Sequence, residues 1–203
     1  MEKTKIHLSA EELQLIHNEE WILTKNRVIE KITHAMGQLG MEMQQTASQS
    51  KDRFVNELLH SNPKVSRGEK YEGLPYIILD YPRIFAKENI LAIRTFFWWG
   101  NFCSITLHVR GDYQGSVSKK LMEHYQLFQN QEFYVSFQGN EWNHDLTTRN
   151  YHLLNTFTVL EMENAFRNAE FFKLCAKVEF NQWDKMETQL FTCFLMLLTL
   201  MEN

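Results

Sequence analysis

The chain has 203 residues, of which 44% are hydrophobic and 23% are charged, and its formal net charge is −4. This length and balance are typical of one globular domain and not of a disordered chain. Domains whose main role is to neutralise phosphate usually carry a positive surplus, so the acidic balance argues against nucleic acid as the partner. The three cysteines lie far apart without C-x-x-C spacing, which favours a reducing cytoplasm over a disulfide framework.

The chain shows no sign of a membrane segment. Its first residues lack the apolar stretch and the cleavage site of a signal peptide. The apolar run from Leu190 to Met201 spans about twelve residues, whereas a transmembrane helix needs about twenty. We therefore expect a cytoplasmic protein that makes no membrane contact, with the apolar run forming a buried helix.

The N-terminal part, residues 1–62, is predicted to be helical. Ser9 and Glu12 have the spacing of a capping box, so a helix should begin there and break near Asn18. From Trp21 to about residue 49 a narrow apolar stripe predicts a long amphipathic helix, and a short helix should follow at 52–60. Such a stripe suits one partner helix, either the C-terminal helix of the same chain or a helix of a second subunit.

The next region, up to residue 75, has Pro, Gly and charges without periodicity and is predicted to be a loop. Strands are then expected at 76–80, 90–99, 102–110, 132–137 and 173–180, with helices at 117–129, after Thr158 and at the C-terminus. Gly100-Asn101 is typical of a two-residue hairpin turn. The fold class is therefore α+β: one domain, 1–203, whose largely antiparallel sheet of about five strands has a central hairpin and packs against the N-terminal and C-terminal helices. Its α+β part is 71–203.

A two-residue turn at Gly100-Asn101 would pair Trp99 with Phe102 and, further along, Arg94 with Leu107. One face of the hairpin would then be apolar. The other would be aromatic at its tip, with Phe97, Trp99 and Phe102, and polar toward its base. The aromatic tip would need a second cover, from this chain or from a partner.

This register also places Arg94 among apolar side chains, where an unpaired guanidinium is costly. Asp80, at the end of the neighbouring predicted strand, is the candidate partner in a structural ion pair. A ligand carboxylate held by Arg94 is the alternative.

No motif assigns a reaction. The glycines and lysines of residues 109–120 lack P-loop spacing, and no pair of histidines has the spacing of a metal site, so we expect no metal and no cofactor. A basic and aromatic stretch near residues 64–83 could bind single strands, but the acidic net charge opposes this role.

Two hypotheses of function remain. The first is a non-enzymatic binding or assembly domain that meets a protein partner or a second copy of itself, through the aromatic side of the hairpin or through the N-terminal helix. The second is a small-molecule-binding protein or an enzyme, with His108 or His144 as general base if it is catalytic. Its pocket at the hairpin base would be lined by Trp99, Thr106, His108, Arg110, His144 and Asp145.

Overall fold

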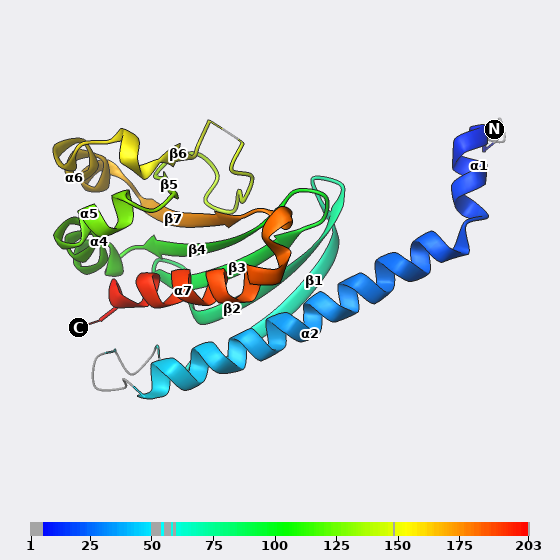
Figure 1. Cartoon of the computed structure of the whole chain (residues 1–203). Coiled ribbons are helices and arrows are strands. Elements are labelled where there is room, and N and C mark those ends of the chain that lie inside the picture. The colour runs from blue at the N-terminus through cyan, green and yellow to red at the C-terminus, as the bar shows by residue number, and fades with distance from the viewer. Residues whose placement is uncertain (1–5, 50–53, 55–57, 59, 148, 203) are drawn as a thin grey trace.

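Seven strands form one sheet in the order β1-β2-β3-β4-β7-β5-β6, and the neighbouring strands are antiparallel (Figure 1). The structure is a computed structural model that describes residues 6–49, 54, 58, 60–147 and 149–202. The strands are β1 (Lys64–Tyr71), β2 (Leu74–Phe85), β3 (Ile90–Trp98), β4 (Phe102–Arg110), β5 (Phe133–Ser136), β6 (His152–Leu153) and β7 (Phe171–Val178).

The helices are α1 (Ala10–Ile16), α2 (Glu19–Gln49), α4 (Tyr113–Glu123), α5 (Tyr125–Gln129), α6 (Val159–Asn168) and α7 (Met186–Thr199), with 3-10 turns η2 (Leu154–Thr156) and η3 (Phe180–Lys185). Within the described residues, no helix is both long and apolar enough to cross a bilayer. The predicted α+β class with a largely antiparallel sheet is confirmed.

Two strands were not predicted from the sequence, so the sheet has seven strands and not about five. β1 lies where the sequence predicts a loop, because its charged residues hide any apolar alternation, as is common in an exposed edge strand. β6 has only two residues. Most of the helix predicted at 52–60 falls outside the described residues.

The helix starts predicted at Ser9 and Thr158 are both confirmed. At α1, Ser9 Oγ accepts a hydrogen bond from the Glu12 amide at 3.1 Å, and Glu12 accepts one from the Ser9 amide. The same capping box opens α6 at Thr158. The last helix differs, because η3 precedes it and α7 begins without a side-chain cap.

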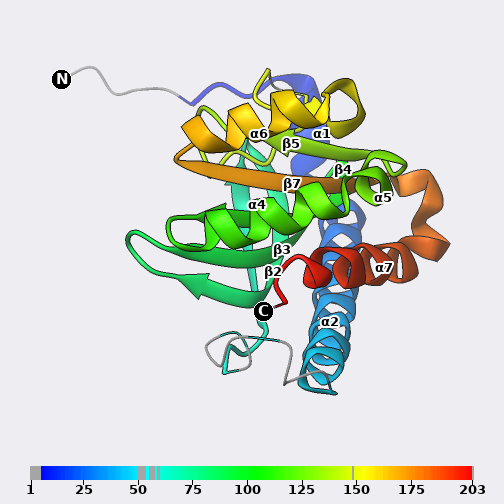
Figure 2. The same cartoon turned by 90° about the vertical axis from the view of Figure 1, so that its left-hand side faces the viewer.

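Helices α2, α4 and α7 cover one face of the sheet, which we call the helix face (Figure 2). The predicted apolar stripe of α2 is buried within the chain, through Ile29, Ile32, Met36, Leu39 and Met43. Gly40 lets this helix approach the sheet, because a Cβ atom there would lie 2.8 Å from Leu79 and 2.9 Å from Pro63. From Ile29 onward the stripe is therefore part of the main core, whereas Trp21 and Ile22 at its start are exposed.

The β3–β4 hairpin forms where predicted, but its turn holds three residues: Trp99, Gly100 and Asn101. Gly100 has a φ of 75°, which favours glycine. Trp98, not Trp99, pairs with Phe102, so the predicted register is wrong by one residue. Such a shift moves every side chain of one strand to the other face relative to its partner.

The corrected register makes Arg94 a neighbour of Thr106, on the face opposite the helices. Residues 138–147 and 149–151 form a loop whose side chains contact this side, and we call them the cover loop and this side the loop face. Near the hairpin tip the loop face is aromatic, and Leu146 and Tyr151 of the cover loop pack against Phe96, Trp98 and Phe102. The hairpin aromatics are thus divided between two faces, since Phe97 belongs to the main core.

The N-terminus extends away from the sheet. Figure 1 shows α1 and the first turns of α2 projecting beyond the rest of the molecule. Every residue from 6 to 24 is exposed, and we call this segment the arm.

Candidate functional site

Polar side chains gather in the middle of the loop face, and we call them the polar cluster: Asp80, Arg94, His108, Arg110, Glu141, His144 and Lys173. Five of them stand on strands β2, β3, β4 and β7, and two come from the cover loop. The register places Asp80 opposite Arg94 and His108 opposite Lys173. Side chains of directly opposite residues share a face of the sheet, so the strands bring these groups together.

Arg94 and Asp80 form a two-bonded ion pair. Arg94 Nε donates to Asp80 Oδ1 at 2.7 Å, and a second nitrogen donates to Oδ2 at 3.0 Å. A third guanidinium nitrogen lies 3.1 Å from His144 Nε2 of the cover loop. These contacts compensate the cost of burying the guanidinium.

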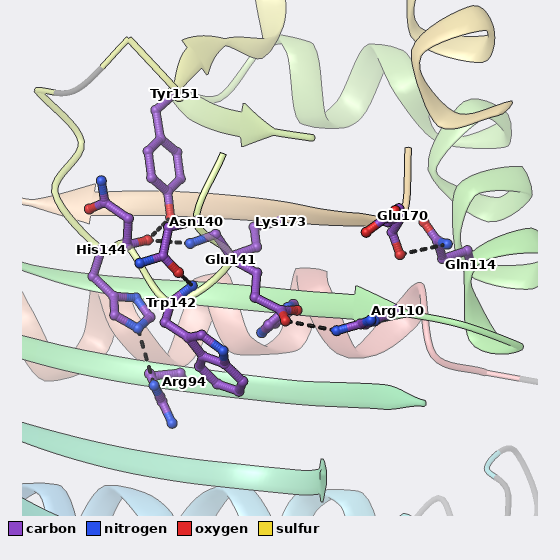
Figure 3. Close-up of polar contacts among 12 residues, drawn as sticks. Arg94, Arg110, Gln114, Asn140, Glu141, Trp142, His144, Tyr151, Glu170 and Lys173 are labelled. Atoms are coloured by element: carbon purple, nitrogen blue, oxygen red, sulfur yellow. Dashed lines mark hydrogen bonds and ion pairs between the residues drawn. The ribbon is translucent and has the colours of Figure 1, made fainter. Parts of the chain in front are cut away.

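Glu141 of the cover loop contacts two side chains of β4, and Figure 3 shows the contact with Arg110. Arg110 donates to Glu141 Oε1 at 2.8 Å, and His108 Nε2 lies 3.1 Å from Oε2. His108 and Arg110 are two residues apart on one strand, so both project from the same face. Each oxygen of the carboxylate therefore has its own donor.

Lys173 lies beneath the cover loop and is fully buried. Its ammonium donates to the main-chain carbonyl of Asn143 and lies 4.8 Å from the centre of the Tyr151 ring. Tyr151 also donates to the Asn143 carbonyl, and Tyr71 of β1 donates to the Asn143 side chain. The cover loop is thus held at Asn143 from three directions.

Burial and nearby positive charge shift the protonation of the cluster. Burial, with Lys173, Arg94 and Arg110, lowers the pKa of His108 to about 3, although the Glu141 carboxylate acts in the opposite direction. Burial and the same lysine lower the pKa of His144 well below its ordinary value. Burial lowers the pKa of Lys173 to about 8. At neutral pH both histidines are therefore neutral, while Lys173 remains largely charged.

Four of the six residues predicted to line a pocket lie together: Thr106, His108, Arg110 and His144 are all on or over the loop face. Asp145 lies beside them in the cover loop, where its carboxylate accepts a hydrogen bond from Thr147. Trp99 does not join them, because the corrected turn places it against the helix-face core. The cover loop fills the space above the sheet, so the cluster is a closed network and not an open pocket.

Glu141 and Lys173 were missed at the sequence level. Lys173 had a signal, because alternation along the apolar strand "FFKLCAKV" puts Lys173, Cys175 and Lys177 on one face. Glu141 had none, since its partners stand more than thirty positions earlier in the chain.

The polar cluster offers charge and hydrogen bonds, but its lysine is closed off from solvent. Among the described residues, no group of three or more His, Cys, Asp or Glu side chains could hold a metal ion. In the closed arrangement the cluster therefore orders the cover loop.

A second candidate surface lies at the other end of the molecule. The arm exposes eight large apolar residues: Ile6, Leu8, Leu13, Leu15, Ile16, Trp21, Ile22 and Leu23. At its base is an apolar groove of about 340 Å³, which we call the groove, lined by Val28, Ile32, Phe97, Trp99, Gly100, Phe180 and Trp183. A smaller hollow joins arm and groove, because Trp21 and Trp99 both line it.

No protein-family model, curated protein or solved structure matches this chain.

Proposed function

We propose that this protein is a homo-oligomeric assembly protein, in which the arm of one copy packs on the groove and arm of another. The observation that carries this proposal is the complete exposure of the arm. α1 has no buried residue, although it carries three large apolar residues, Leu13, Leu15 and Ile16. Leu8, just before the helix, is apolar and exposed as well. Contiguous apolar surface of this kind is normally covered in a single-chain protein and marks an interaction site when it is not.

The exposed area fits a stable interface. The eight apolar residues of the arm are 43–87% exposed, so their burial would supply much of the roughly 800 Å² that one partner contributes to an interface of standard size. Burial of this surface supplies the main driving force for association. A short helix such as α1 is also marginal alone in water, so a partner would stabilise it.

The chain itself carries a surface suited to the arm, which favours a second copy over an unrelated partner. The groove is lined by Phe97, Trp99, Phe180 and Trp183, and Trp183 is 43% exposed. Because the groove adjoins the base of the arm, one two-fold interface would include both surfaces from each copy. Such a closed arrangement would cover both apolar surfaces and end at a dimer.

Size-exclusion chromatography with light scattering tests this proposal. We expect the wild-type chain to have twice the chain mass. The double variant Leu15→Glu/Trp21→Glu should have the mass of one chain, because two carboxylates would be buried without partners. Trp183→Glu, on the groove, should weaken the dimer as well.

Leu160→Glu is the matched control, since Leu160 of α6 is 65% exposed and lies outside the arm and the groove. It should leave the dimer unchanged. A wild-type chain that stays monomeric, or a dimer that survives Leu15→Glu/Trp21→Glu, contradicts the proposal. Circular dichroism confirms that each variant is folded.

A further inference from the structure

We propose that the His108–Arg110 edge of β4 is a binding site for a small carboxylate-bearing molecule, and that Glu141 of the cover loop occupies this site in the closed structure. The inference is independent of the proposed assembly through the arm. It assigns to the polar cluster a ligand class, and to the cover loop the role of a displaceable lid.

The first step is that the sheet supplies the hydrogen-bond donors and the cover loop supplies their acceptors. The donors are on central strands, where pairing on both sides fixes the backbone: Arg94, Arg110 and Lys173. The cover loop supplies acceptors for all three: the Glu141 carboxylate, the Asn143 carbonyl and the His144 ring. When the loop lifts, the sheet therefore keeps a preformed cationic surface.

The second step is the charge balance of that surface. Arg94 is neutralised by Asp80 on the adjacent strand, so this pair stays balanced whether the loop is open or closed. Arg110 and Lys173 are two cations, and Glu141 is the other carboxylate of the cluster. When Glu141 leaves, an anion that enters in its place would restore the balance of charge beside Arg110.

The third step is the geometry, which favours a carboxylate. The two oxygens of Glu141 lie 2.8 Å and 3.1 Å from donors on neighbouring same-face positions of β4. This arrangement provides one donor for each oxygen of a planar carboxylate. A ligand carboxylate could replace Glu141 without loss of either contact.

The fourth step is access. The side chain of Arg110 is 31% exposed and that of Glu141 is 16% exposed, so this end of the cluster reaches the surface. Trp142 packs edge-on against His108, with ring centres 5.4 Å apart, yet it remains 45% exposed. The two ends of the loop meet at Gly139 and Asn150, where a Cβ atom on Gly139 would lie 2.6 Å from the asparagine side chain. The two ends of the loop therefore lie close together, as in a compact Ω-loop.

The fifth step is unused hydrogen-bonding capacity. His144 is buried, and its Nδ1 atom finds no hydrogen-bond partner among the residues that the structure describes. Buried polar atoms of this kind are rare and call for an explanation. The unpaired atom is a cost of the closed arrangement, which lifting the loop into solvent would remove.

Succinate, with the uncharged diamide succinamide as control, is a direct probe. The indole N–H resonance of Trp142 in a proton–nitrogen correlation spectrum, assigned by its loss in Trp142→Phe, reports on the cover loop. We expect succinate to shift this resonance saturably in the wild-type protein and succinamide to leave it unchanged. Arg110→Gln should abolish the shift.

Glu141→Ala sharpens the test, because it removes the internal competitor. Succinate should then bind about tenfold more tightly, since the binding-competent state is no longer a minor one. If Glu141→Ala does not fold, Glu141→Gln removes the charge with little change in size. The succinate titration of the wild-type protein tests the proposal even if neither variant folds. No saturable shift in the wild type, an equal shift with succinamide, or a shift that survives Arg110→Gln overturns the proposal. Binding confined to Glu141→Ala also overturns it, because Glu141 would then be a fixed structural partner.

Discussion

On the helix face of the sheet, side chains such as Ile105, Leu107 and Phe172 pack against helices over a continuous apolar core. On the loop face, the same strands carry ion pairs with one another and hydrogen bonds to the cover loop. Apolar packing is non-directional and tolerates small shifts, whereas the polar contacts need correct partners at short range. The comparison teaches that one sheet can use one face for stability and keep the other for a loop that is able to open.

The largest effect is expected on the helix face. Phe194 of α7 is fully buried beside Tyr81 and Phe191. Phe194→Ala should lower the free energy of unfolding by about 3–5 kcal/mol, because it leaves a cavity in the main core. Urea denaturation followed by circular dichroism measures this loss. A change below about 1 kcal/mol would mean that the core closes over the cavity.

Acid should weaken the loop face next. His108 and His144 stay neutral in the folded chain, while in the unfolded chain they take up protons below their ordinary pKa of about 6.5. The unfolded state then binds more protons, so stability falls as the pH drops from 6.5 toward 3. Between pH 7 and 5 the part of this loss due to His108 should be about 2 kcal/mol, and His144 should add to the loss in the same direction.

His108→Gln provides the control for this pH dependence. It should remove about 2 kcal/mol of the fall between pH 7 and 5, because glutamine does not titrate, and the fall that remains includes the part due to His144. Urea denaturation at a series of pH values gives the slope. An unchanged slope would show that His108 is protonated in the folded chain, through its contact with Glu141.

The ion pair between the strands should contribute less. Asp80→Asn keeps the size of the side chain but leaves the Arg94 guanidinium without its charged partner, which should cost about 2 kcal/mol. The double variant Asp80→Asn/Arg94→Met should recover part of this loss, since no buried charge remains. If the double variant is less stable than Asp80→Asn, Arg94 makes a further stabilising contact through His144.

The smallest effects on stability are expected for a threonine-to-valine substitution, which can be made on both faces of the sheet and so compares them directly. Thr95 is buried on the helix face, and its hydroxyl has no hydrogen-bond partner within the described part of the chain, whereas Thr106 on the loop face donates to Cys175 at 3.1 Å. Thr95→Val should be neutral or stabilising by about 0.5–1 kcal/mol, and Thr106→Val should destabilise by about 1 kcal/mol. Thermal unfolding separates the two. Equal changes of the same sign would contradict the distinction between the faces.

The sequence predicted best what local patterns control. The capping boxes at Ser9 and Thr158, the apolar stripe of α2 and the hairpin at Gly100 all depend on neighbouring residues. The length of the turn did not follow from them, because Gly100 suits both a two-residue and a three-residue turn. That single residue of difference misplaced Arg94 among apolar neighbours and separated it from His108.

The candidate site was predicted only in part for the same reason. Period-two alternation along β4 correctly placed Thr106, His108 and Arg110 on one face. The partners that close the site come from a loop, and the path of a loop over a sheet depends on contacts far apart in sequence. The sequence offered no rule that would bring Glu141 to Arg110 or Asn143 to Lys173.

The two outer strands of the sheet have a consequence for self-association. β1 is rich in charge, with Lys64, Arg67, Glu69 and Lys70, and at the opposite side β6 ends the sheet after two residues. Charged or very short outer strands are poor templates for strands of another chain, so they oppose fibril-like stacking. The outer strands of this sheet therefore disfavour extension of the sheet by the strands of a second copy.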